Sequence, residues 1–150
     1  MPKFDLDQVP PVSSTGYPGI FAKAVEGRLS QRLTGPLGLD DFGVQIITLL
    51  PGGWSSQRHW HEAEDEFLYM LEGEAVLIED GGETPIKAGE CAVFRKNVPN
   101  GHHLINRSEL PAKYLVVGAR GSNGNCHYPD IDLAVDMATG GYTHKDGTPY

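Results

Sequence analysis

Two histidines and a glutamate lie close together in the sequence and have the residue types of a metal site. His59, His61 and Glu66 fall in one short run, and a histidine pair, His102-His103, follows further along the chain. In an extended strand successive side chains point to opposite faces, so His59 and His61 would share one face. Two imidazoles are then directed at one point, and this arrangement indicates a bound metal ion.

The elements that must position these side chains are short β-strands. Residues 42–50 are apolar and β-branched and end at the turn signal Pro51-Gly52-Gly53. Further strands, each bounded by Gly, Pro, Asn or Asp, are predicted at residues 66–71, 74–78, 84–87, 91–94, 102–105 and 113–117. Many short strands without a helical pattern between them predict an antiparallel all-β sandwich or barrel.

The two ends of the chain lack this periodicity. Residues 1–19 are rich in Pro, Gly and Ser and are expected to form an irregular N-terminal arm that packs on the core or on a neighbouring subunit. Residues 20–33 fit helix and strand equally well, and the segment after Arg120 is expected to be loop-like, with one short strand at residues 133–135. We therefore expect the arm and one barrel domain over residues 20–150, since 150 residues suffice for one core.

Charge and composition argue against two classes of partner. The net charge of −8 repels phosphate backbones and no cluster of Lys and Arg offsets it, so no nucleic-acid partner is expected. The amino terminus lacks a secretory pattern and no apolar stretch approaches the roughly 20 residues of a membrane span, so we expect a cytoplasmic protein with no membrane partner. Cys91 and Cys126 form no Cys-x-x-Cys unit and are expected to be reduced thiols.

Two motifs resemble those of the cupin superfamily. The first is Gly53-x5-His59-x-His61-x4-Glu66-x6-Gly73, which is similar to the first cupin motif at every marked position. The second is looser and consists of Gly89-Glu90, Pro99, Gly101 and His102-x3-Asn106. The chain also resembles a group of small single-domain bacterial cupins known by their fold rather than by a reaction. The resemblance implies a jelly-roll barrel, also called a double-stranded β-helix.

The same resemblance implies the metal ligands His59, His61, Glu66 and His102. Three imidazoles and one carboxylate suit a divalent metal ion such as Fe, Mn, Ni or Zn. Four protein ligands on an octahedral metal leave two positions for water or substrate, and an open position is what a catalyst needs.

Two of these assignments have competitors in the sequence. Only one histidine of the pair can face inward; the spacing to Asn106 favours His102, and a bulge near Gly101 would favour His103 instead. Asp65 competes with Glu66, which is preferred because six residues then separate the acid from Gly73. Glu62, Glu64 and Asp65 are expected to form a solvated acidic rim.

The function expected from this site is metal-dependent chemistry on a small polar organic molecule. Fe(II) would favour dioxygenation, whereas Mn(II) or Zn(II) would favour isomerase, lyase or hydrolytic chemistry. No spacing argument selects a catalytic acid or base among Tyr69, Tyr114 and His103. The alternative is a non-catalytic sensor or binding protein that holds a small ligand through its metal. The habit of cupins to pair their barrels, together with the N-terminal arm, predicts a homodimer.

Overall fold

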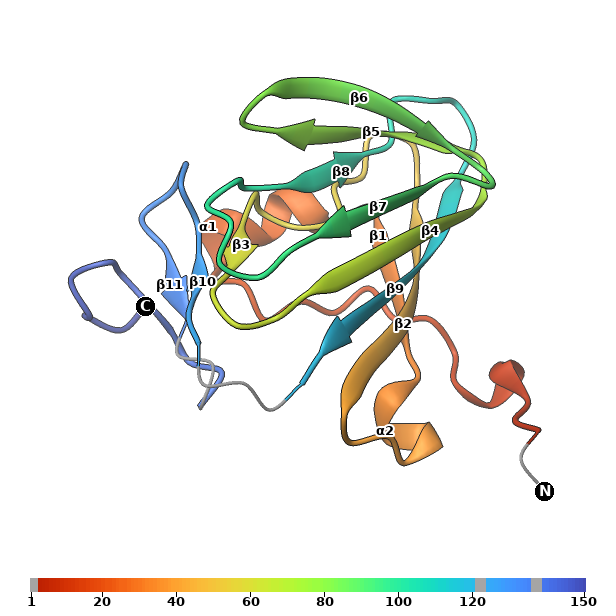
Figure 1. The fold of residues 1–150 in the computed structure, drawn as a ribbon, viewed down its shortest axis with the longest axis horizontal. Coiled ribbons are helices and arrows are strands. Elements are labelled where there is room, and N and C mark those ends of the chain that lie inside the picture. The colour runs from red at the N-terminus through yellow and green to blue at the C-terminus, as the bar shows by residue number, and fades with distance from the viewer. Residues whose placement is uncertain (1–2, 121–123, 136–138) are drawn as a thin grey trace.

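The apolar, β-branched segments of the sequence form the larger sheet of the protein (Figure 1). The computed structural model describes residues 3–120, 124–135 and 139–150. Its five-stranded antiparallel sheet has the order β1-β2-β9-β4-β7. The strands are β1 (Arg28–Arg32), β2 (Phe42–Leu49), β4 (Glu66–Glu72), β7 (Cys91–Phe94) and β9 (Ala112–Ala119).

A second antiparallel sheet covers one face of the first, and the hydrophobic core lies between them. This sheet has the order β6-β5-β8, with β5 (Glu74–Glu79), β6 (Gly82–Lys87) and β8 (His103–Ile105). Core side chains come from both sheets, among them Leu49, Met70, Leu77 and Leu104. The strands predicted between residues 42 and 117 are confirmed, with ends that differ by at most two residues. The predicted antiparallel all-β class is also confirmed.

A small third sheet joins the C-terminal segment to the histidine run. Its order is β12-β11-β10-β3, with β3 (Trp60–His61), β10 (Cys126–His127), β11 (Ala134–Val135) and β12 (Tyr142–Thr143). β11 confirms the strand predicted near residue 134, but β10 and β12 were not expected in a segment predicted to be loop-like. Strands of two residues carry no periodic pattern, and they form here because β10 pairs with β3.

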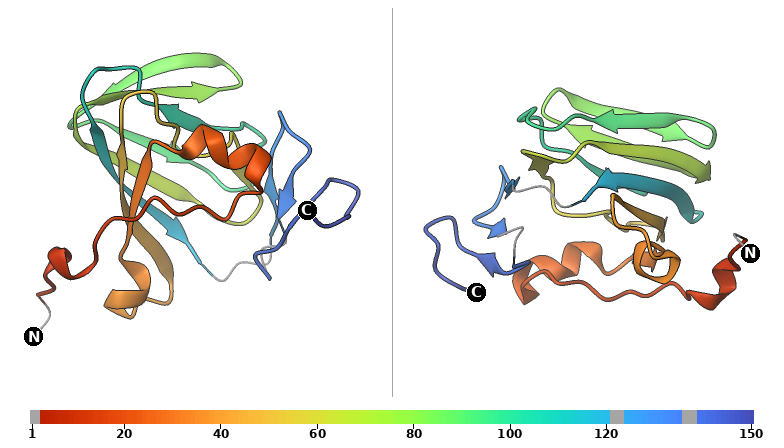
Figure 2. Two further views of the ribbon diagram at one scale, coloured as in Figure 1. Left: turned by 180° about the vertical axis from the view of Figure 1, so that it is seen from behind. Right: turned by 60° about the horizontal axis from the view of Figure 1, so that its bottom comes forward.

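The N-terminal part runs along the edge of the larger sheet (Figure 2). A 3-10 helix η1 (Leu6–Gln8) is followed by a bridge in which the Val12 amide donates to the Ser30 carbonyl over 2.9 Å. The ambiguous residues 20–33 contain helix and strand in succession: α1 (Gly19–Ala22), η2 (Lys23–Val25) and β1, after which α2 (Thr34–Leu37) ends at Gly38 with a φ of 65°. Within the described ranges no helix has the length and apolar character needed to cross a bilayer.

Candidate metal centre

Backbone pairing brings the two histidine segments of the sequence together. His59 precedes β3 and His102 precedes β8, and the two residues form an isolated antiparallel bridge. The His102 amide donates to the His59 carbonyl over 2.9 Å, and the His59 amide donates to the His102 carbonyl over 3.2 Å. The two imidazole centroids are 5.0 Å apart. Residues from the two motifs therefore share one site.

Glu66 completes the cluster from the beginning of β4. Its Oε2 atom lies 3.1 Å from His102 Nε2 and 3.6 Å from His61 Nε2. The His59 and His61 rings are 4.9 Å apart. Ligand atoms of His59, Glu66 and His102 all lie within 4.8 Å of one another, so this His/Glu cluster is able to hold a metal ion. The structure thus groups three of the four candidate ligands, His59, Glu66 and His102, and places the fourth, His61, beside Glu66.

The hydrogen bonding of the imidazoles fits a cation. His61 Nδ1 and His102 Nδ1 are buried, and neither has a hydrogen-bond partner within the described part of the chain. An unpaired buried polar atom costs free energy, and a cation beside Glu66 would be bound by the other nitrogen of each ring, Nε2. His59 Nδ1 lies 2.9 Å from the Gln57 carbonyl oxygen, which leaves its Nε2 for a metal. The donor set of neutral nitrogens and one carboxylate suits a divalent first-row metal.

Electrostatics keep His59 and Glu66 in the protonation states that metals bind. Burial lowers the pKa of His59 to about 4, so its imidazole is neutral at pH 7. Burial alone would raise the pKa of Glu66, but the hydrogen bond with His102 and the nearby imidazoles outweigh it and lower that pKa to about 2. Glu66 is therefore a carboxylate. Neutral imidazole and ionised carboxylate are the ligand forms.

The histidine pair is divided between two environments. The His102 ring stacks on Phe94 with centroids 3.6 Å apart and faces Glu66. The His103 ring packs edge-on against Trp54 at 4.6 Å, and its Nδ1 lies 3.2 Å from the Ser56 carbonyl oxygen. His102 is thus the member of the pair directed at the cluster.

The acidic residues next to Glu66 differ from the expected solvated rim. Asp65 is exposed and accepts the Lys96 amide over 2.8 Å, so it lies outside the cluster. Glu64 was expected in solvent, and that expectation is wrong: its side chain is 18% exposed, lines the cavity, and lies 3.7 Å from His61 Nδ1. Residues 62–65 have no strand periodicity, so no sequence pattern shows which of them turns inward.

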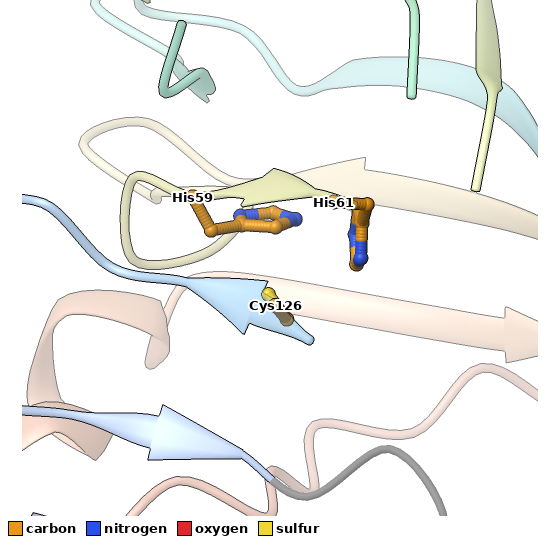
Figure 3. A group of neighbouring side chains, drawn as sticks. All are labelled: His59, His61 and Cys126. Carbon is orange, nitrogen blue, oxygen red and sulfur yellow. The ribbon is translucent and has the colours of Figure 1, made fainter. Parts of the chain in front are cut away.

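Cys126 is a neighbour of the cluster that sequence reasoning did not assign to it. It pairs with His61 across β10 and β3, and its Sγ lies within 4.8 Å of ligand atoms of His59 and His61 (Figure 3). Burial raises the pKa of the Cys126 thiol to about 12. A protonated thiol is a poor metal ligand, so the cysteine is expected to act as a small apolar wall.

A cavity of about 730 Å³ opens onto the cluster. Tyr114 lines it, and burial raises the pKa of this phenol above its ordinary value. Tyr69 is 39% exposed and is not among the residues that line the cavity. His103 is likewise turned away, and Tyr114 is the one of the three candidates that faces the cavity. Other lining residues are Arg28, Ser30, Arg32, Ser55, Ser56, Leu68, Val116 and Arg120.

Comparison with known proteins identifies the family. A model of the cupin domain matches residues 45–118. A solved structure from Silicibacter pomeroyi, described as a sugar phosphate isomerase from a cupin superfamily, is similar with a TM-score of 0.91 and 43% identity, over 99% of this chain and 96% of that one. This chain belongs to the cupin superfamily. The predicted resemblance and the jelly-roll fold are confirmed.

Two further relatives of this cupin differ in what their names describe. An oxalate-binding protein from Thermotoga maritima is 37% identical over 68 residues, which are 45% of this chain and 54% of that protein. The chain therefore spans about half the length of this curated relative. A polyketide cyclase from Streptomyces resistomycificus has a TM-score of 0.64 and 22% identity over 79% of each chain, which shows the shared fold alone.

Proposed function

We propose that this cupin is a metal-dependent enzyme acting on a small polar organic substrate, of dioxygenase or isomerase type. The proposed ligands are His59, His61, Glu66 and His102, and the proposed metal is a divalent Fe, Mn, Ni or Zn ion. The observation that carries the proposal is the convergence of these side chains, with Glu66 Oε2 3.1 Å from His102 and 3.6 Å from His61. The name of the Silicibacter relative supports the isomerase type.

The residues around the cluster suit such chemistry. A bound divalent metal would supply a Lewis acid or a centre that activates dioxygen. Leu68, Val116 and Phe94 give the cavity apolar walls that displace water from a bound substrate. Tyr114 lines the same cavity, and because burial raises its pKa, its hydroxyl stays protonated and acts as a hydrogen-bond donor rather than as a base.

The test of the metal site is elemental analysis of the purified protein. We expect near-stoichiometric metal in the wild type and its loss in the His59→Ala, His61→Ala double variant. His144→Ala is the matched control, since that side chain is partly exposed and lies 2.8 Å from an Asp132 oxygen, among residues that do not line the cavity. Equal metal content in the double variant and the control would refute the ligand assignment.

The fourth ligand needs its own comparison, because His102 and His103 are adjacent and equally buried. We expect His102→Ala to lose metal and His103→Ala to retain it. His103 packs against Trp54, so its replacement will lower stability, and metal content is therefore measured on the folded fraction after size-exclusion chromatography. The reverse result would move the site to the other face of the strand.

Measuring the conversion of substrate distinguishes an enzyme from a protein that only binds its ligand. The metal-loaded protein is offered a panel of small hydroxy acids, keto acids and phosphorylated sugars with and without oxygen. Oxygen uptake would indicate a dioxygenase, and rearrangement without uptake would indicate an isomerase. Tight binding of a panel member without any conversion would contradict the enzyme and favour the ligand-binding alternative.

The oligomeric state proposed is a homodimer. Apolar side chains on the outward face of β4 and β7 are 39–60% exposed, namely Phe67, Tyr69, Leu71 and Val93, and a second copy would cover them. Phe67 and Val93 lie opposite each other in the β4–β7 ladder. We expect light scattering to give a dimer that Val93→Lys dissociates, and a wild-type monomer at all concentrations would refute the proposal.

A further inference from the structure

The cavity has an open floor beside Glu66 because two neighbouring strand positions are glycine. Gly118 of β9 lies opposite Glu66 of β4 and also opposite Gly43 of β2. A Cβ atom at Gly118 would lie 3.5 Å from Glu66 Cγ, and one at Gly43 would lie 3.7 Å from the Gly118 oxygen. Glycine within a strand weakens the sheet and often marks a site where a ligand approaches the backbone. We name Gly43 and Gly118 the glycine floor.

Three arginines line the same cavity from the side of the glycine floor away from Glu66. Every second residue of β1 faces the cavity, because side chains two positions apart in a strand lie on the same face. These residues are Arg28, Ser30 and Arg32. Arg120 follows β9, and its Cγ lies 3.9 Å from the position of a Cβ at Gly43. The stem of Arg120 therefore runs along the floor.

Within the described part of the chain these arginines have no acidic partner. Elsewhere in the protein Arg58 pairs with Asp80 and Asp130, and Arg107 pairs with Glu83. Among the described residues none of the three cavity arginines has a carboxylate within 4.0 Å. Arg28 donates to the Ser55 carbonyl over 2.8 Å and Arg120 to the Leu39 carbonyl over 3.3 Å, which leaves most guanidinium donors available.

The local charge of the cavity is opposite to that of the protein. The chain carries a net charge of −8, yet the cavity is lined by three arginines and by two carboxylates, Glu64 and Glu66. Glu66 faces the imidazoles of the metal cluster, so its charge is already engaged. A concave site with excess positive charge in an acidic protein concentrates small anions.

We propose that Arg32 and Arg120 form an anion-binding subsite that holds a phosphate or carboxylate group of the substrate, with Arg28 further along the same cavity wall. The glycine floor provides the path from this subsite to the His/Glu cluster, where the reacting end of the substrate lies. Neighbouring strands are spaced about 4.8 Å apart. Glu66 and Gly43 lie two strands apart, so roughly 10 Å separates them across the sheet, perpendicular to the strands. The substrate is therefore a chain of several atoms with an anionic end. This inference rests on the proposed function for the reacting end only.

The test is calorimetric titration of the full chain, both as purified and after removal of metal by a chelator. The probes are inorganic phosphate, succinate and uncharged glycerol. We expect at least one anion to bind in both preparations and glycerol to bind in neither. Arg32→Gln combined with Arg120→Gln should weaken anion binding by roughly tenfold or more, because hydrogen bonds between charged groups are lost. Binding of phosphate alone or of succinate alone identifies the anionic group.

Two further variants make the test specific. Arg107→Gln is the matched control, since this exposed arginine pairs with Glu83 outside the cavity and should leave anion affinity unchanged. Gly43→Val fills the glycine floor without a backbone clash, and it should weaken anion binding while metal content stays at the wild-type level. Circular dichroism confirms that each variant is folded.

The outcomes separate this subsite from the metal site. The inference is overturned if neither anion binds, if the double arginine variant binds as tightly as the wild type, or if Arg107→Gln loses affinity to the same extent. If the protein contains no metal under any condition and still binds an anion, the subsite is supported. Only the metal-dependent function is then refuted.

Discussion

Replacing Asn106 with aspartate tests how the segment that carries His102 is held against the larger sheet. Asn106 is fully buried, and its Nδ2 donates to the Leu49 and Leu110 carbonyls, each over 2.8 Å. Its Oδ1 accepts the Ser108 amide over 2.9 Å. Asn106→Asp retains the shape and this acceptor, but it replaces both donations with contacts between oxygen atoms.

The magnitude follows from the lost donation to the buried Leu49 carbonyl, because the Leu110 carbonyl keeps the Ser108 hydroxyl as a donor. A buried carbonyl left without its partner costs about 1–3 kcal/mol, so the variant should lose about 1–3 kcal/mol of unfolding free energy. For a domain of this size each kcal/mol lowers the Tm by about 2–4 °C, which predicts a fall of roughly 2–12 °C. Burying the new charge adds to the loss at neutral pH.

The pH dependence gives the prediction a second signature. Burial raises the pKa of the introduced carboxyl group above its value in the unfolded chain. The folded variant therefore binds more protons than the unfolded one between the two pKa values, and its stability falls as pH rises through that window. The deficit relative to wild type should thus be smaller at pH 5 than at pH 7.5, as measured by urea denaturation followed by circular dichroism.

Asn97→Asp is the matched control, because it makes the same chemical change at an exposed residue. Asn97 has a φ of 58°, a conformation that both Asn and Asp tolerate. We expect a change within about 0.5 kcal/mol there, as for surface substitutions in general. Equal urea midpoints for the two variants, or a deficit that grows as pH falls, would refute the reasoning.

Three other predictions concern the turn after β4, the two thiols and the metal. Gly73→Ala should cost more than 1 kcal/mol by urea denaturation, because a Cβ there would lie 2.7 Å from the Pro111 oxygen at a φ of 72°; wild-type stability would contradict this. In a thiol-reagent titration the exposed Cys91 should react rapidly and the buried Cys126 only after denaturation, so two fast thiols in the native protein would be contrary evidence. Removing the metal with a chelator should lower the Tm by roughly 8–16 °C if metal is present at about a thousand times its Kd, and an unchanged Tm would count against the site.

Much of the fold could be predicted from local sequence features. Runs such as residues 42–49 alternate or cluster apolar residues and end at Gly or Pro, and strand ends were therefore predicted to within two residues. The resemblance of the first motif to that of the cupin superfamily likewise indicated His59, His61 and Glu66 as candidate ligands. The segment beyond residue 120 could not be predicted in this way, because β10 and β12 have two residues each and depend on pairing with distant strands.

The sequence by itself determined the antiparallel β class, the family resemblance and the residue types of the candidate site, because periodicity and motif spacing are local properties. The tertiary structure decided which side chains meet. The bridge between His59 and His102 directs His102 rather than His103 at Glu66, and the register of β1, β2 and β9 places Arg32 and Arg120 near the glycine floor. Such contacts depend on strand register across the whole barrel, and a shift of one residue would turn each side chain to the opposite face.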